Sequence, residues 1–402
     1  MFVEILLAIL IGSCLGIVTG LTPGIHINLV AVILLSLSPF LSQYINPFFV
    51  AAAIIAMSIV HTFLDFIPSC FLGAPDESTI MSVLPGHKLL LQGRGFEAVK
   101  LASIGSFLGL IVVIVFLPVM IFTVPWIFSN LQNYIAIILI IIVFYMILRE
   151  SKIKGKFWAL FIFIISGIMG VLVFGMNIKD PLFPMFSGLF GISMLITSLS
   201  QKVVIPEQRI SNDLEIPKNE LFKSIFAGTI SGSLVSIFPG MGPAQAAILG
   251  NGLVGKIKDH MYLVLVGAIG TVSMALSLIT LYTINKARNG SIIVVQKILG
   301  QIDLNIFLLI MAVSLIAGAI GVFLTMFFAR IFTKLITKVN YSFLCFSIIL
   351  LVSFLVLYMT GFLGILVLMT ATAIGIMPGI VGIGRNHAMG ALLLPIILYL
   401  IL

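Results

Sequence analysis

LTPGIHINL at residues 21–29 and IFPGMGPAQ at residues 237–245 place a Pro-Gly pair inside an apolar stretch of each half of the chain. Small residues recur in the same register around the two pairs: Gly12, Gly16, Pro23, Gly24 and Ala31 match Gly228, Gly232, Pro239, Gly240 and Ala247. Proline lacks a backbone donor and glycine adopts dihedral angles closed to other residues, so each pair predicts a broken helix. Broken apolar segments at corresponding positions of two halves are typical of the binding site of a secondary transporter.

The composition of the chain places it in a lipid bilayer. Hydrophobic residues make up 61% of its 402 residues and charged residues 8%, whereas a soluble protein carries roughly a quarter charged residues. Apolar stretches long enough to cross about 30 Å of hydrocarbon recur from end to end, and we expect about 14 crossing or part-crossing helices. The sequence therefore predicts an all-α, multi-pass protein of the plasma membrane.

The net charge of +8 does not indicate a nucleic-acid partner. Its basic residues are spread among short loops rather than gathered on one face, as expected for contact with the headgroups of membrane lipids. A polar stretch at 200–220 cannot remain in lipid and predicts a cytoplasmic linker. It divides the chain into an N-terminal transmembrane repeat at 1–199 and a C-terminal repeat at 221–402.

The distribution of charged loops favours inverted over parallel repeats. Dense basic loops lie at 149–156 in the first half and 330–338 in the second, and by segment order they match the neutral stretches 359–361 and 123–132. Because basic loops stay in the cytoplasm, this alternation predicts an odd number of spans in each half, about seven, and opposite orientations for the two halves. The amino terminus would then lie outside and the linker inside.

The residues beside the two breaks are the first candidate ligands. A helix that starts after a break presents unpaired N–H groups and the positive end of its dipole, which suit an anion. The alternatives are a proline kink relieved by packing, an interhelical hydrogen bond for His26 and an ordinary helix cap for Thr22. The candidate substrate-binding residues here are Thr22, Pro23, Gly24, His26, Asn28, Pro239, Gly240, Gly242 and Gln245.

Asp65 lies in an apolar run four residues after His61, so the two side chains share one helix face. An ionised carboxylate in the membrane costs about 2.5 to 3.5 kcal/mol even on the mildest scale, so such residues usually have a function. We interpret Asp65 as a residue for a coupling ion, Na⁺ or H⁺. The alternatives are a static pair with His61 and a position near the membrane surface.

GAPDEST at 73–79 has the composition of a broken, re-entrant hairpin. Asp76 and Glu77 offer hard oxygen ligands for the coupling ion, while Ser78 and Thr79 offer hydroxyl groups for an anionic substrate. The alternative is an exposed acidic turn in which Ser78 caps a helix.

Two basic segments add candidate anion ligands. In the inverted topology NKARNG at 285–290 places Arg288 outside the cell, against the positive-inside rule, and attraction of an anionic substrate would explain it. An ordinary loop is the alternative. Arg385, between glycines in the last hydrophobic region, could grip a carboxylate or phosphate bidentately or extend to the membrane surface.

No nucleophile elbow, HExxH or Walker motif occurs, so we expect neither an enzyme nor an ATP-driven pump, and neither a cofactor nor a metal site beyond Na⁺. Two further classes stay open. A translocase for a polyprenyl phosphate would also use paired broken helices and scattered Arg and Lys. A membrane-embedded enzyme acting on a lipid would use His61, Asp65 and Asp76 as acid–base groups.

The chain resembles the large membrane subunit of the tripartite tricarboxylate transporters, the TctA family, in a shorter, archaeal-like form. The resemblance rests on the paired Pro-Gly segments, on GAPDEST leading into LPGHKLLLQGRGFEAVKLASIGSFLG, and on GIMGVLVFGMNIKDPLFPMFSGLFGISML at 167–195. It implies ion-coupled carboxylate uptake with a small membrane subunit and an extracytoplasmic binding protein. It also implies that both Pro-Gly pairs line the substrate cavity.

The chain departs from this family in two respects. Asp76 and Glu77 stand where the family's hairpin usually has small residues, which leaves the substrate open. The chain is also shorter than typical large subunits, which leaves open whether it needs accessory subunits or works alone, and whether it forms a homodimer.

Overall fold

A computed structural model describes residues 2–22, 27–41, 43–73, 79–150, 152–178, 181–200, 205–210, 216–238, 242–255, 258–337 and 341–402. Every regular element within these ranges is a helix, which confirms the all-α class. In this described part of the chain, eight helical segments are long and apolar enough to cross a membrane, and four shorter helices are also apolar. The expected number of about 14 membrane segments stays a prediction.

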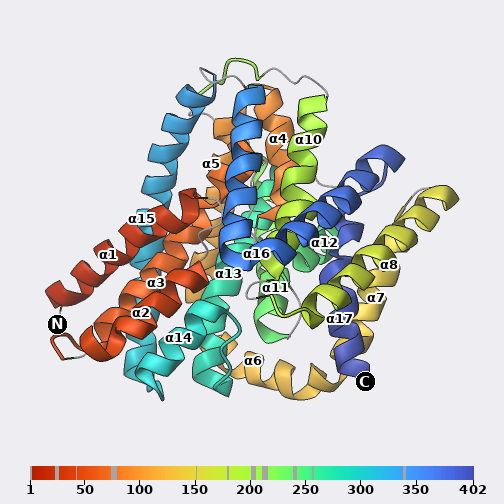
Figure 1. Cartoon of the computed structure of the whole chain (residues 1–402). Helices are drawn as coiled ribbons and strands as arrows, with labels where there is room; N and C mark the ends of the chain where they lie inside the picture. Colours follow the sequence, from red (N-terminus) through yellow and green to blue (C-terminus); the bar gives the residue numbers. More distant parts are fainter. Residues whose placement is uncertain are drawn as a thin grey trace.

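Within the described residues, the first half of the chain forms ten α-helices (Figure 1). They are α1 (Phe2–Leu21), α2 (Ile27–Leu41), α3 (Pro47–Leu64), α4 (Val83–Leu91), α5 (Gly95–Val115), α6 (Leu117–Leu131), α7 (Ile135–Leu148), α8 (Ile153–Gly175), α9 (Leu182–Phe186) and α10 (Ser193–Ser200). Two π-helical turns interrupt this series, η1 (Pro68–Leu72) after α3 and η4 (Ser187–Ile192) between α9 and α10. Such turns are rare and often mark functional regions.

The second half contributes α11 (Lys218–Ile237), α12 (Pro243–Val254), α13 (Asp259–Ile284), α14 (Gly290–Leu299), α15 (Leu304–Ile336), α16 (Tyr341–Val381), the 3₁₀ turn η5 (Arg385–Met389) and α17 (Gly390–Ile401). Gly361, with φ +72°, interrupts α16, because a left-handed conformation cannot continue the helix. This break falls in the neutral stretch 359–361.

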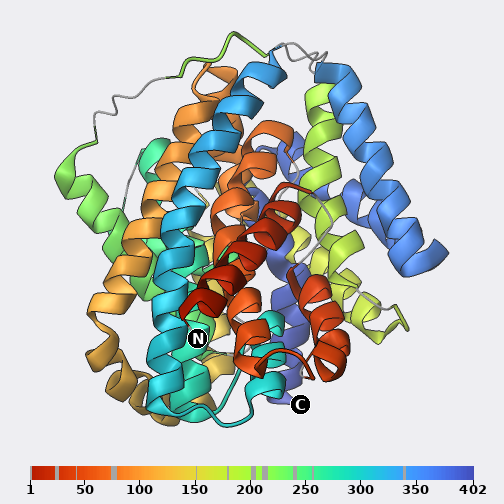
Figure 2. The same cartoon turned by 90° about the vertical axis from the view of Figure 1, so that its left-hand side faces the viewer.

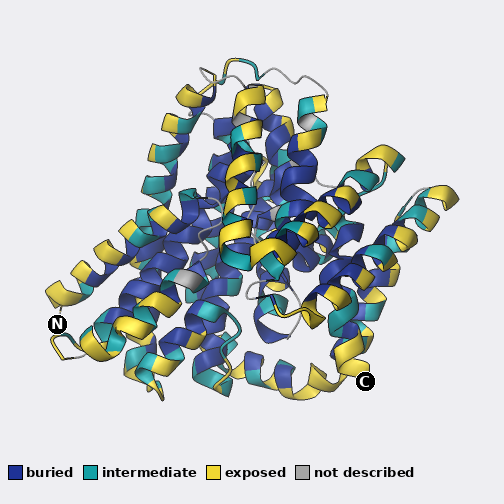
Figure 3. Cartoon of the chain, in the orientation of Figure 1, coloured by how far each residue is buried: buried dark blue, intermediate teal, exposed yellow. Residues whose placement is uncertain are grey.

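Small residues allow α1 to pack closely on α3, and α11 on α13. A Cβ atom on Gly16 would lie 2.8 Å from Cβ of Val60, and one on Gly228 would lie 2.7 Å from Cβ of Ala268. Helices that approach this closely gain dispersion contacts in a bilayer, where the hydrophobic effect does not drive helix association. Figure 3 shows α3 and α13 among the most deeply buried elements, with exposed residues gathered on the outer helices.

The described part of the linker marks one end of the molecule, at the top of Figures 1 and 2. Arg209 N donates to Gly93 O at 2.8 Å, and Gly95 N donates to Oε1 of Gln208 at 3.0 Å. Helix α5 therefore starts at the linker, whereas α15 ends near this side of the molecule. Helices α6 and α14 lie at the opposite end.

Candidate functional site

The second break separates α11, which ends at Ile237, from α12, which begins at Pro243. Gln245 lies in the first turn of α12 and is fully buried. Its Oε1 accepts a hydrogen bond of 2.9 Å from Gly242 N. Its Nε2 has no hydrogen-bond partner among the residues that the structure describes. A buried amide donor without a partner costs free energy, so this N–H group suits a ligand that binds at the break.

Arg288 brings a positive charge to the same break. Its Nη2 donates to Ile237 O at 3.1 Å, at the negative end of the α11 dipole. Burial lowers the pKa of the Arg288 guanidinium from its ordinary value, but an arginine keeps its charge at neutral pH. Arg288 Nε is also buried without a partner in the described part of the chain. Two unused donors, Arg288 Nε and Gln245 Nε2, thus belong to residues flanking the second break.

The loop that carries Arg288 also contacts the first break. Asn28 lies in the first turn of α2, directly after that break. A Cβ atom on Gly290 would lie 2.6 Å from Cγ of Asn28, so the loop and the start of α2 are in close contact. The loop at 285–290 therefore lies between the end of α11 and the start of α2, and it connects the residues flanking the two breaks.

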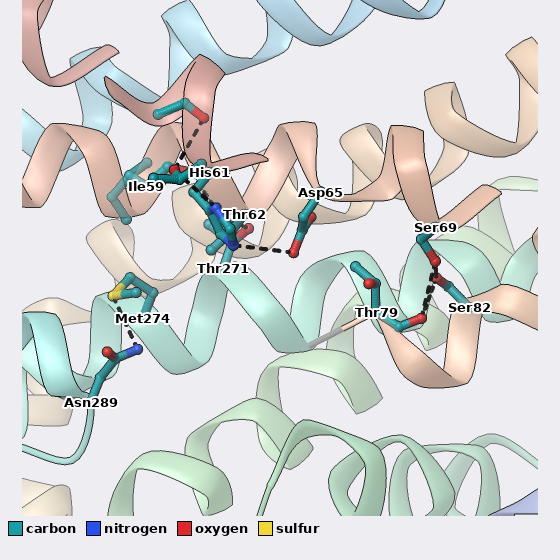
Figure 4. Close-up of polar contacts among 12 residues, drawn as sticks. Ile59, His61, Thr62, Asp65, Ser69, Thr79, Ser82, Thr271, Met274 and Asn289 are labelled. Atoms are coloured by element: carbon teal, nitrogen blue, oxygen red, sulfur yellow. Dashed lines mark hydrogen bonds and ion pairs between the residues drawn. The ribbon is translucent and has the colours of Figure 1, made fainter. Parts of the chain in front are cut away.

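A polar pair lies on the α1 side of the first break. Thr22 directly follows α1, and its role as a helix cap stays a prediction because residues 23–26 lie outside the described ranges. Thr19, one turn earlier, has its Oγ1 3.1 Å from His61 Nδ1 on α3. His61 Nε2 in turn lies 3.9 Å from Oδ2 of Asp65, as Figure 4 shows. Asp65 is only 2% exposed, which sets a carboxyl group inside the protein near the end of α1.

The two halves meet through hydroxyl groups that the sequence did not single out. Oγ1 of Thr62 on α3 lies 3.0 Å from Oγ1 of Thr271 on α13 (Figure 4). On α13, Ser273 O accepts hydrogen bonds from Ser236 Oγ at 2.6 Å and from Ser277 Oγ at 2.8 Å. The polar groups of α13 in these contacts are thus small hydroxyl groups, whereas α3 carries His61 and is directly followed by Asp65. The sequence pattern that could have predicted these contacts is the recurrence of Ser and Thr along α13 at helical spacing.

Thr79 lies in a separate contact after the GAPDEST segment. It is fully buried, and its carbonyl oxygen accepts hydrogen bonds from Ser82 Oγ at 2.6 Å and from Ser69 Oγ at 3.4 Å. Figure 4 shows these three residues apart from His61 and Thr62, with Asp65 in between. The contacts fix the chain at the end of the predicted hairpin.

Arg385 belongs to a different cluster. It lies in η5, and its Nη1 donates to Ser193 Oγ at 3.3 Å. Nearby, His387 Nε2 lies 2.9 Å from Oε1 of Glu150 in the loop between α7 and α8. Among the described residues, no hydrogen bond joins Arg385 to those flanking the two breaks.

Several candidate residues lie outside the described ranges: Pro23, Gly24, His26, Asp76, Glu77, Ser78, Pro239 and Gly240. Their roles stay predictions. Among the residues described, no group of three or more His, Cys, Asp or Glu side chains could hold a metal ion.

Comparison with known proteins supports the class that the helices and the paired breaks indicate, a multi-pass membrane transporter. The model of the tripartite tricarboxylate transporter TctA family matches residues 6–390. An uncharacterized protein of Methanocaldococcus jannaschii is 30% identical over 406 aligned positions, which cover 98% of each chain. No solved structure matches the chain. The chain belongs to the TctA family and is a transporter component of the plasma membrane.

Proposed function

We propose that the chain is a secondary active transporter that moves a small carboxylate, coupled to Na⁺ or H⁺, and binds it between the two Pro-Gly breaks. One observation carries this proposal: the loop at 285–290 places Arg288 at the end of α11 and Gly290 against Asn28 at the start of α2. A cation held between two helix breaks can attract an anion to a site that both halves of the protein form.

The donors at the second break support a carboxylate as the cargo. Arg288 Nε and Gln245 Nε2 are both buried and unused in the described residues. The first turn of α12 adds backbone N–H groups and the positive end of a helix dipole. An anion with oxygen acceptors would satisfy donors that otherwise stay unpaired, whereas a cation or an apolar molecule would not.

The orientation of the helices supports inverted repeats, with 1–199 and 221–402 as the two units. Helices α5 and α15 are counterparts by segment order, and one starts at the linker side while the other ends there. The matching packing of Gly16 on α3 and of Gly232 on α13 adds to this argument. In inverted repeats, rocking of one unit against the other around a shared site gives alternating access.

Asp65 is our candidate for the coupling ion. It is buried, it lies on the same helix face as His61, and His61 contacts Thr19 near the first break. A carboxyl group there can gain a proton or bind Na⁺ as the substrate binds nearby, which would link the two events. Asp76 and Glu77 in the predicted hairpin stay candidates for the same role.

Family membership supports a tripartite system, in which a small membrane subunit and an extracytoplasmic binding protein work with this chain. The candidate anion site and Asp65 both lie in this chain, so we expect the chain to transport without these subunits and the subunits to deliver substrate to it. No observation favours the polyprenyl-phosphate translocase over the carboxylate transporter.

Ligand binding to the purified chain tests the proposal without any partner subunit. Citrate, succinate and a polyprenyl phosphate are compared by thermal shift in sodium and in potassium buffer, because a ligand that binds the native state raises its melting temperature. We expect stabilisation by a carboxylate in the wild type and its loss in Arg288→Gln. Stabilisation by the lipid phosphate alone would overturn the proposal.

A further inference from the structure

One aromatic ring accompanies both cations of the loop at 285–290. Phe128 lies on α6 and is 9% exposed. Lys286 Nζ lies 4.3 Å from the centroid of its ring, and Arg288 Cζ lies 5.4 Å from the same centroid. Both distances are within the range in which a cation is attracted to an aromatic face.

The Phe128 ring is an uncharged partner for Lys286 and Arg288, whereas basic side chains usually pair with a carboxylate. Within the described part of the chain, neither Lys286 nor Arg288 forms an ion pair with Asp or Glu. A carboxylate would hold the two side chains but would also cancel part of their charge. The Phe128 ring attracts them through its quadrupole and leaves the full positive charge in place.

The three residues that offer hydrogen-bond donors to an anion, Lys286, Arg288 and Gln245, are buried to different extents. Lys286 is exposed, Arg288 is half-buried, and Gln245 is fully buried. Arg288 contacts the end of α11, and Gln245 lies in the first turn of α12, on the other side of the second break. Lys286 is therefore the most accessible of the three, and it carries a full charge.

We propose that Phe128 is a positioning residue for anion binding, which holds Lys286 and Arg288 in place without neutralising them. This inference rests on the proposed function and assigns a role to α6, an element that the Pro-Gly breaks do not include.

The test uses the full-length purified chain with Phe128→Leu and Phe128→Tyr. Leucine is apolar and lacks the aromatic face, whereas tyrosine keeps it. Phe122→Leu is the matched control, because Phe122 lies on the same helix and is 77% exposed. Two quantities are measured: hydrogen exchange of residues 285–290 without ligand, and the dissociation constant of citrate.

We expect faster exchange of 285–290 in Phe128→Leu than in the wild type and in Phe122→Leu. Citrate binding should weaken about five- to tenfold in Phe128→Leu and stay within about twofold in Phe128→Tyr, as expected for the loss or retention of cation–π contacts.

Unchanged exchange in Phe128→Leu would overturn the proposal, whatever the ligand. Faster exchange with unchanged citrate affinity would overturn the positioning role, and so would a Phe128→Tyr variant as weak as Phe128→Leu. If the wild type binds neither citrate nor succinate, the proposed function itself fails, and the exchange data still decide whether Phe128 holds the loop.

Discussion

Oγ1 of Thr62 lies 3.0 Å from Oγ1 of Thr271, and this hydrogen bond joins α3 of the first half to α13 of the second. Both side chains are buried, Thr62 at 5% exposure and Thr271 at 0%. The contact lies one residue from His61, so the junction between the halves adjoins the polar face that carries Asp65.

The Thr62–Thr271 hydrogen bond should give a measurable coupling energy. Interhelical hydrogen bonds in membranes contribute about 0.6 kcal/mol on average and up to about 1.7 kcal/mol. We expect a coupling energy in this range from a double-mutant cycle of Thr62→Val and Thr271→Val, measured by unfolding in detergent. Strictly additive effects would show that the two hydroxyl groups do not interact.

Arg288 should determine affinity for the substrate. In Arg288→Gln the cation at the end of α11 is lost, so kcat/KM for carboxylate uptake should fall about 10- to 100-fold, as expected for a lost charge-assisted contact. Lysine keeps the charge but loses the planar fork, so Arg288→Lys should fall in between. Lys297→Gln, in the last turn of α14, is the control for loss of a basic residue. Equal uptake by the wild type and Arg288→Gln would exclude Arg288 from the site.

Asp65 should couple transport to the ion. Asp65→Asn keeps the shape of the side chain but cannot exchange a proton, and it is a poorer ligand for Na⁺. We expect loss of gradient-driven accumulation, while exchange of internal for external substrate persists. The two modes are separated by uptake and counterflow in proteoliposomes.

Asp303→Asn is a matched control for Asp65→Asn. Asp303 Oδ1 accepts from Ile306 N at the start of α15, and asparagine caps a helix about as well as aspartate does. The control should transport normally. If Asp65→Asn also accumulates substrate as the wild type does, Asp65 is not the coupling residue.

The close packing of α1 on α3 should not tolerate added volume. In Gly16→Ala the new Cβ would lie 2.8 Å from Cβ of Val60, which requires α1 or α3 to shift. Overpacking of this kind costs about 1 to 3 kcal/mol. Gly175→Ala, at the end of α8, meets no atom within 4 Å and is the matched control. Thermal unfolding in detergent measures both, and equal melting temperatures would contradict the packing described.

The sequence predicted the positions of the breaks because Pro and Gly act locally on the backbone. Helix α1 ends at Leu21 and α2 begins at Ile27, while α11 ends at Ile237 and α12 begins at Pro243. Local helical spacing also predicted that His61 and Asp65 share one face. The distance of 3.9 Å between His61 Nε2 and Asp65 Oδ2 agrees with this prediction.

Contacts between distant segments were not predictable in the same way. The pairing of Thr62 with Thr271, and the contact of Phe128 with Lys286 and Arg288, depend on how whole helices pack in three dimensions. No spacing along one chain encodes that packing. The π-helical turn at Pro68–Leu72 was missed for a related reason, since the apolar pattern does not distinguish it from α-helix.

Gradient-driven uptake tests the central claim most directly. The purified chain is reconstituted into liposomes, and uptake of radiolabelled citrate and succinate is measured under an inward Na⁺ gradient and, separately, an inward H⁺ gradient. The account predicts accumulation of a carboxylate above equilibrium with one of these gradients, and loss of this accumulation in both Arg288→Gln and Asp65→Asn. Accumulation that is equally strong in the wild type and in both variants would contradict it.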